Sequence, residues 1–166
     1  MKNIFNRVLT IDPGDNTALA YWGGNLYPDT QIIRLRPKER NLRREEQLVL
    51  MWDRFEYQIT RYHPINTAYI EGVQVWAGSL KSLTAARKGT LLKLVYLIGG
   101  YCKIMDNHGI EFHIINPQEW KGQLSKQAVA NRIKRITGNT YNTEHETDAV
   151  GIGLSMMKQK EIIRRF

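Results

Sequence analysis

Cysteine is nearly absent from this chain of 166 residues, since Cys102 is the only one. A single cysteine excludes a disulfide framework and a cysteine-based zinc site within one chain, and it favours a reducing compartment, with the cytoplasm as the expected location. Long apolar runs are also lacking, because Lys93 and Gly99-Gly100 interrupt the stretch from Leu91 to Cys102. The segment that follows Met1 lacks a signal-peptide core. We therefore expect neither a secreted protein nor a membrane partner.

Acidic residues are in the minority. The chain has 16 Asp and Glu against 24 Lys and Arg, which gives a formal net charge of +8 and a pI near 9.7. Such an excess of positive charge favours a polyanionic partner, above all nucleic acid. The content of 42% apolar and 24% charged residues is that of a globular protein and excludes a disordered, collagenous or coiled-coil chain. Because no repeat or linker divides the sequence, we expect one domain over residues 1–166.

The spacing of apolar residues predicts the secondary structure. In chain order we expect strands at 7–12, 17–22 and 31–35, a helix at 43–62, a strand at 67–71, a long helical stretch after Gly78 with the apolar residues from Leu91 to Met105 on one face, a strand at 111–115, and helices at 125–137 and 145–159. Short connections between the first three strands favour an antiparallel meander. The order βββαβαβαα then predicts an α/β fold with a mixed five-stranded sheet flanked by helices.

Two carboxylates stand at predicted strand ends. Asp12 closes the first strand and, by alternation, shares a face with Val8 and Thr10. A turn aspartate before Pro-Gly is the structural alternative for Asp12. Glu71 closes a strongly apolar strand, and strand ends in α/β sheets are places where ligands gather. The pair is therefore a candidate for a site at one edge of the sheet.

A third acidic element begins the last predicted helix, in the sequence Glu144-His145-Glu146-Thr147-Asp148. His145 and Asp148 are three residues apart, and Glu144 and Asp148 are four apart, so either pair can project from one face of a helix. Acidic residues favour helix N-termini in general, which accounts for Glu144 and Glu146. Asp148 is different, because small residues follow it and would let the helix approach the sheet closely.

Carboxylates that cluster repel one another, and a divalent cation between them removes the repulsion. In a basic protein, carboxylates that hold Mg²⁺ or Mn²⁺ fit metal-assisted hydrolysis of a phosphodiester bond. These residues therefore indicate a nuclease.

The motifs resemble, in type and order, those of the RuvC-type Holliday-junction resolvases of the RNase H-like superfamily, most of all their small bacteriophage members. The similar stretches are Leu9-Thr10-Ile11-Asp12-Pro13-Gly14, Tyr69-Ile70-Glu71, Asn116-Pro117-Gln118-Glu119-Trp120-Lys121 with Ser125-Lys126-Gln127, and His145-Glu146-Thr147-Asp148-Ala149. The resemblance implies an active site of Asp12, Glu71, His145 and Asp148 that binds two Mg²⁺ or Mn²⁺ ions. It also selects His145 over Glu144, and it implies a bacterial or phage-infected host cell.

The resemblance further implies that Lys121 and Lys126 contact DNA. Where many resolvases carry an aromatic residue three positions after the catalytic Glu, this chain has Gln74, and Trp76 is either its replacement or a core residue. Further contacts to the DNA backbone are expected from three basic residues beyond Glu71, namely Lys81, Arg87 and Lys88. No base-reading motif is visible, so recognition is expected to depend on DNA shape.

The leading hypothesis is a homodimeric, metal-dependent endonuclease that makes paired symmetric incisions in four-way DNA junctions and needs no small-molecule cofactor. A two-fold dimer matches the near two-fold symmetry of a junction. Its expected surface is the apolar face of the helix from Leu91 to Met105, although that face could equally cover the sheet. The alternatives are another RNase H-like nuclease, such as a flap or branch nuclease or a ribonuclease H, and a catalytically silent junction-binding protein.

Overall fold

The computed structural model describes residues 6–24, 27–73, 84 and 89–159. Its elements in chain order are β1 (Asn6–Asp12), β2 (Asn16–Gly23), β3 (Asp29–Arg34), a 3₁₀ helix (Pro37–Asn41), α1 (Arg44–Tyr62), β4 (Thr67–Glu71), α3 (Thr90–Asn107), β5 (Glu111–Ile115), α4 (Pro117–Lys121), α5 (Lys126–Thr137) and α6 (Glu144–Gln159). All nine predicted elements are present, and their boundaries differ by up to two residues where the structure describes them. The start of the helical stretch predicted after Gly78 lies outside the described residues. The 3₁₀ helix and α4 were not predicted. Among the described residues, no helix has the length and apolar character needed to span a bilayer.

The five strands form one mixed sheet in the order β3-β2-β1-β4-β5. β1 and β3 each run antiparallel to β2, whereas β4 runs parallel to both β1 and β5. The predicted mixed sheet is thereby confirmed. In the parallel pair Ile11 lies opposite Ile70, so Asp12 and Glu71 are the next residues on two neighbouring strands. Both strands end at the same edge of the sheet, as the sequence predicted.

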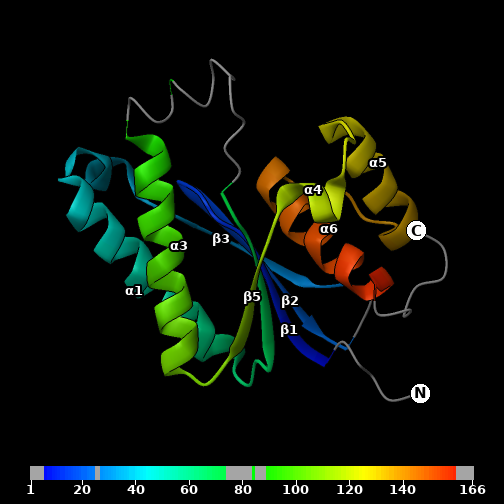
Figure 1. The fold of residues 1–166 in the computed structure, drawn as a ribbon, viewed down its shortest axis with the longest axis horizontal. Coiled ribbons are helices and arrows are strands. Elements are labelled where there is room, and N and C mark those ends of the chain that lie inside the picture. The colour runs from blue at the N-terminus through cyan, green and yellow to red at the C-terminus, as the bar shows by residue number, and fades with distance from the viewer. Residues whose placement is uncertain (1–5, 25–26, 74–83, 85–88, 160–166) are drawn as a thin grey trace.

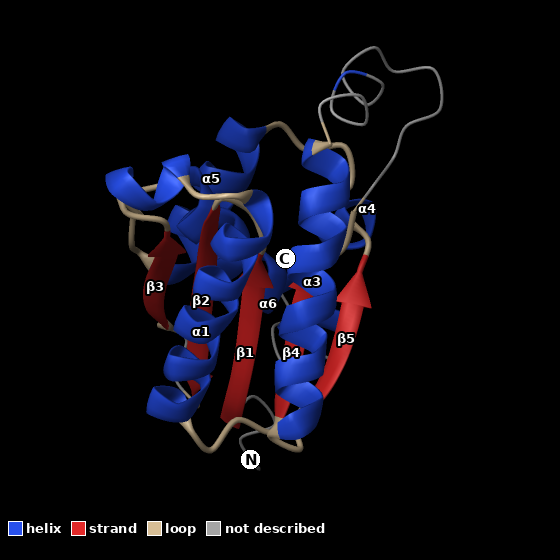
Figure 2. Cartoon of the chain, turned by 90° about the vertical axis from the view of Figure 1, so that its left-hand side faces the viewer, coloured by secondary structure: helices blue, strands red, loops and turns tan. Residues whose placement is uncertain are grey.

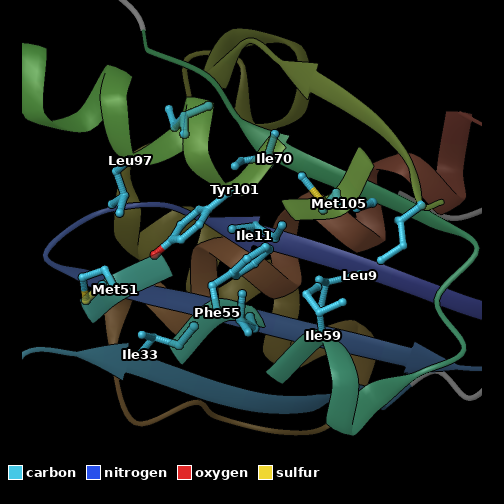
Figure 3. Close-up of a cluster of buried hydrophobic side chains, with 14 of the residues drawn as sticks. Leu9, Ile11, Ile33, Met51, Phe55, Ile59, Ile70, Leu97, Tyr101 and Met105 are labelled. Atoms are coloured by element: carbon cyan, nitrogen blue, oxygen red, sulfur yellow. The ribbon is translucent and has the colours of Figure 1, made fainter. Parts of the chain in front are cut away.

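Helices cover both faces of the sheet, with α1 and α3 on one side and α4, α5 and α6 on the other (Figure 1). Figure 2 shows α1 and α3 in front of the sheet, running roughly along the direction of the strands. The core beneath α1 and α3 contains Leu9 and Ile11 of β1, which point to this side by strand alternation. Phe55 of α1 stacks on Tyr101 of α3 within this core, at a distance of 4.1 Å between ring centroids (Figure 3).

The other face of the sheet carries the second core and the acidic residues. Val8, Ala18 and Ala20 pack there beneath α6. Gly153 of α6 lies against the indole of Trp22, and a Cβ atom at this position would come within 2.3 Å of the ring. The small residues of α6 therefore allow the close approach to the sheet that the sequence predicted.

We predict that Gly153→Ala destabilises the protein by about 1–3 kcal/mol, because the added methyl group overpacks a buried ring. Chemical denaturation of the two proteins measures the difference. The same substitution in a Trp22→Phe background should cost less, since the smaller ring leaves room, and a double-mutant cycle detects this coupling. Equal costs in both backgrounds would contradict the packing described here.

Candidate active site

Asp12 is a buried carboxylate at the end of β1, on the face that α6 covers. The turn that follows it is held by Thr17, whose hydroxyl donates to the carbonyl of Gly14 at 2.9 Å and lies 3.0 Å from the hydroxyl of Tyr101. One oxygen of Asp12, Oδ2, lies 2.7 Å from Nδ1 of His145. Residues separated by 133 positions in the sequence therefore meet at this edge of the sheet.

A capping box fixes where α6 begins. The backbone N–H of Thr143 donates to the Glu146 carboxylate at 3.1 Å, and the backbone N–H of Glu146 donates to the Thr143 hydroxyl at 3.1 Å. The Thr30 hydroxyl donates to the other oxygen of Glu146 at 3.0 Å and ties the box to β3. Glu146 is thus a capping residue, as its place at a helix start indicated. The box sets the helical register that brings His145 to Asp12.

Glu144 lies outside this contact. Its carboxylate accepts a hydrogen bond from Nζ of Lys126 at 2.5 Å, and both side chains are largely exposed. Of the two residues that sequence spacing left open, the structure therefore brings His145 to Asp12 and pairs Glu144 with a lysine. Asp148, one turn further along α6, is half-buried.

Glu71 closes β4 and is held by two consecutive residues of α4. The indole Nε1–H of Trp120 donates to Oε2 of Glu71 at 2.9 Å, and Nζ of Lys121 donates to Oε1 at 3.5 Å. The short α4 forms because Asn116 caps it, accepting a hydrogen bond from the Gln118 N–H at 2.9 Å, and because a proline occupies the first turn.

Burial raises the pKa of each of these three carboxyl groups, and repulsion from neighbouring carboxylates adds to the effect. For Asp12 burial is the main cause, and the charges of Glu71 and Asp148 add to it, so that its pKa rises to about 7 despite the opposing hydrogen bond from His145. Burial likewise raises the pKa of Glu71, against the effects of Lys121 and Trp120. Burial raises the pKa of Asp148 as well, against those of Lys121, Lys126 and His145. The three carboxylates thus form one electrostatic unit.

The donor set suits a hard divalent cation, because it consists of carboxylate oxygens and one imidazole that is a ligand when neutral. Burial with mutual repulsion is the condition that a bound cation relieves. In the part of the chain that the structure describes, no three His, Cys, Asp or Glu side chains already converge on one point. Asp12 contacts His145, and Glu71 contacts Trp120 and Lys121.

The structure places two of the seven predicted DNA-contact residues beside these acids. Lys121 is half-buried against Glu71, and Lys126 is exposed next to Glu144. A hollow of about 370 Å³ is lined in part by Glu71 and Lys121, and another of about 260 Å³ in part by Lys126 and Asp148. The other five predicted residues lie outside the described part of the chain: Gln74, Trp76, Lys81, Arg87 and Lys88.

Sequence reasoning gave Trp120 no role of its own at this site. In the stretch from Asn116 to Lys121 it assigned a contact with DNA to Lys121, and it assigned no secondary structure there. The signal was present, because Asn116, Pro117 and Glu119 have the types and spacing of a capped helix start. A helix beginning at Pro117 brings both Trp120 and Lys121 to Glu71.

Solved structures of known proteins resemble this chain, whereas sequence comparisons find no match. No family model and no curated protein sequence matches the chain. A structure of RuvC from T. thermophilus in complex with Holliday junction substrate matches with a TM-score of 0.70 and 16% identity, over 93% of this chain and 96% of that one. A second Thermus thermophilus RuvC structure gives a TM-score of 0.65 and 17% identity, with the same coverage.

A yeast mitochondrial Holliday junction resolvase matches as well, with a TM-score of 0.64 and 12% identity over 95% of this chain and 82% of that one. At these identities the likeness concerns the fold. The predicted resemblance to RuvC-type resolvases, with their RNase H-like sheet and flanking helices, is therefore confirmed at the level of the fold.

The raised pKa of Asp12 leads to a prediction about stability. A carboxyl group whose pKa is higher in the folded state than the unfolded value of about 3.9 costs stability when it ionises, so this cost grows as pH rises between about 4 and 7. In metal-free buffer, Asp12→Asn should therefore be more stable than wild type at pH 8, by on the order of 1–3 kcal/mol.

Thermal unfolding in EDTA at pH 8 and pH 5 measures this difference, which should shrink at the lower pH. The matched control is Glu144→Gln, because the ion pair with Lys126 lowers the pKa of that exposed carboxyl group. Glu144→Gln should bring no gain in stability. A loss of stability for Asp12→Asn at pH 8 would contradict the repulsion described here.

Proposed function

We propose that this protein is a metal-dependent endonuclease selective for four-way DNA junctions. The observation that carries the proposal is the group of buried and half-buried carboxylates, Asp12, Glu71 and Asp148, at one edge of a RuvC-like sheet, in a chain with a net charge of +8. Two of the structures with this fold are described as a complex with Holliday junction substrate and as a Holliday junction resolvase, which supports junction DNA as the substrate.

In this proposal Asp12, Glu71, Asp148 and His145 hold the metal. The chemistry that two Mg²⁺ or Mn²⁺ ions supply when bound is activation of the attacking water and stabilisation of the leaving oxygen. Lys121, already beside Glu71, is placed to bind a phosphate oxygen next to the scissile bond and to stabilise charge that develops there. Lys126 can bind a neighbouring phosphate once it leaves Glu144.

The two hollows beside the acidic residues support a DNA strand passing over this edge of the sheet. The first hollow is bounded by the end of β4, by the first turns of α3 and by α4. The second lies between α5 and the start of α6. A DNA strand that entered both hollows would meet Glu71 and Lys121 in one and Asp148 and Lys126 in the other. Such an arrangement contacts the phosphate backbone and not the base edges, which agrees with recognition of DNA shape.

We propose that the active form is a homodimer, with a surface that differs from the one expected from sequence. The face of α3 formed by Ile98, Tyr101 and Met105 is buried in the core and is not free to bind a partner. The opposite face exposes Leu92, Val95 and Tyr96 by 56%, 48% and 56%, at helical spacings of three and four. An exposed apolar patch of this kind is typical of a protein–protein interface.

Substitution of the acids tests the catalytic proposal. Asp12→Asn, Glu71→Gln and Asp148→Asn should each lower the rate of junction cleavage a thousand-fold or more, because each removes a metal ligand, which is worth several kcal/mol in the transition state. Binding of the junction should persist, since these groups hold metal and not DNA. The assay uses a labelled synthetic four-way junction with and without Mg²⁺ or Mn²⁺, and a linear duplex, a flap and an RNA–DNA hybrid as competing substrates.

Near wild-type cleavage by any of the three folded variants would mean that the residue is wrongly assigned. Equal cleavage of all four substrates would favour a general RNase H-like nuclease. If wild type binds the junction but cleaves it with neither Mg²⁺ nor Mn²⁺, the protein is a catalytically silent junction-binding protein.

Substitution of an exposed apolar residue of α3 by a charged residue tests the dimer proposal. Tyr96→Glu should convert the dimer to a monomer, because a carboxylate would be buried in an apolar interface. Tyr57→Glu on α1 is the matched control, since Tyr57 is also an exposed tyrosine, at 66%, and lies on a different helix. Light scattering measures the mass of each protein. A monomeric wild type, or equal dissociation of both variants, would contradict the assignment of α3.

A further inference from the structure

Two buried tryptophans on the same face of the sheet use their indole N–H groups differently. Trp22 donates to the hydroxyl of Thr10 at 3.0 Å, within the core. Trp120 donates to Oε2 of Glu71 at 2.9 Å. Glu71 belongs to the proposed metal site. Trp120 therefore belongs to the second core and also donates a hydrogen bond to a proposed metal ligand.

Trp120 is held firmly enough to orient another side chain. Only 7% of its surface is exposed, and its ring lies against Gly151 of α6, where an added Cβ atom would come within 2.5 Å of the ring. Its backbone belongs to the capped helix α4, directly after β5, which is paired with β4. The ring is therefore fixed between the strand that carries Glu71 and the helix that carries Asp148.

The indole restricts Glu71 in a defined way. An indole nitrogen can donate a hydrogen bond but cannot accept one, so it holds one carboxylate oxygen and fixes the rotation of the group. With Oε2 held by Trp120, the other oxygen, Oε1, is the one that Lys121 approaches, at 3.5 Å. The ammonium of Lys121 also lies 4.9 Å from the centre of the Trp120 ring. Lys121 can leave for a phosphate while the indole keeps its hydrogen bond.

Gly151 extends this arrangement to the rest of the site. It lies three residues, or about one helical turn, after Asp148. Any side chain at position 151 would push the indole away from α6, so the contact sets the distance between α4 and the helix that carries Asp148. A single ring thereby fixes Glu71 directly and Asp148 through the helix.

We propose that Trp120 is a positioning residue of the metal site, which sets the orientation of the Glu71 carboxylate through its N–H group and the spacing of Glu71 and Asp148 through its ring. This inference rests on the proposed function, because it assumes that Glu71 binds a divalent cation. Partners that orient ligands in this way commonly change metal affinity or activity 10- to 100-fold when they are removed.

The test is a calorimetric titration of Mn²⁺ into DNA-free protein, which measures the affinity for the ion. Trp120→Phe keeps an aromatic ring against Gly151 but lacks the N–H group, and it should bind Mn²⁺ about 10- to 100-fold more weakly than wild type. Trp22→Phe, which removes the other indole hydrogen bond, should bind Mn²⁺ as wild type does. Because the two variants lose the same group from the same core, a general effect of core disturbance would affect both.

Junction cleavage provides the second measurement. For Trp120→Phe the concentration of Mn²⁺ that gives half-maximal rate should rise by the same factor, while the rate at saturating Mn²⁺ should return to near the wild-type value. A residue needed only for folding would lower the rate at every metal concentration. If Trp120→Phe proves unfolded by circular dichroism, 3-benzothienylalanine at position 120 keeps the bicyclic shape without the N–H group and takes its place.

Unchanged Mn²⁺ affinity in a folded variant without the N–H group would overturn this inference and leave the proposed function intact. Equal weakening by Trp22→Phe would also overturn it, because the effect would then come from the core. Failure of wild type itself to bind Mn²⁺ would overturn both the inference and the proposed function.

Discussion

Repulsion among carboxylates that are withdrawn from solvent, Asp12 fully and Glu71 and Asp148 in part, is the constraint on which the rest of this structure depends. Asp12, Glu71 and Asp148 come from three separate segments, and each has a pKa raised by burial. Sequestering them from water costs stability unless cations or hydrogen-bond donors lie close by. Such groups lie next to two of the three carboxylates: His145 contacts Asp12, and Trp120 and Lys121 donate to Glu71.

The remaining elements serve to bring these groups together. Parallel pairing of β1 with β4 places the first two acids side by side at one edge of the sheet. Helix α6 adds its residues because Gly151 and Gly153 let it lie close to two indole rings, and because the box of Thr143 and Glu146 sets its start. Local rules of capping and packing thus determine the geometry of a site whose members are far apart in sequence.

Local sequence signals were sufficient to predict the sheet and the positions of Asp12 and Glu71 at the ends of two strands. Alternation identified the strands, and a carboxylate at the end of an apolar strand stood out against that pattern at Asp12 and Glu71. Spacing on a helix was not sufficient at the start of α6, because Glu144 and His145 are both compatible with Asp148. The capping box resolves the register, since it fixes which residue faces β1.

Other features depended on tertiary contacts that a single sequence does not display. Helix α4 has only five residues, so its apolar pattern is too short to read, and the contact of Trp120 with Glu71 follows from where β5 ends. For α3, both sides of the helix carry apolar residues, and packing against α1 and the sheet decides which side is buried. The exposed side therefore became a candidate interface only once the fold was known.

Crystals grown with Mn²⁺ and measured at the manganese absorption edge test the central claim most directly. The account predicts anomalous scattering peaks bounded by the carboxylates of Asp12, Glu71 and Asp148, with Lys121 displaced from Oε1 of Glu71 and the indole of Trp120 still bonded to Oε2. An absence of peaks at this edge of the sheet, or peaks confined to exposed acids such as Glu144, would contradict it.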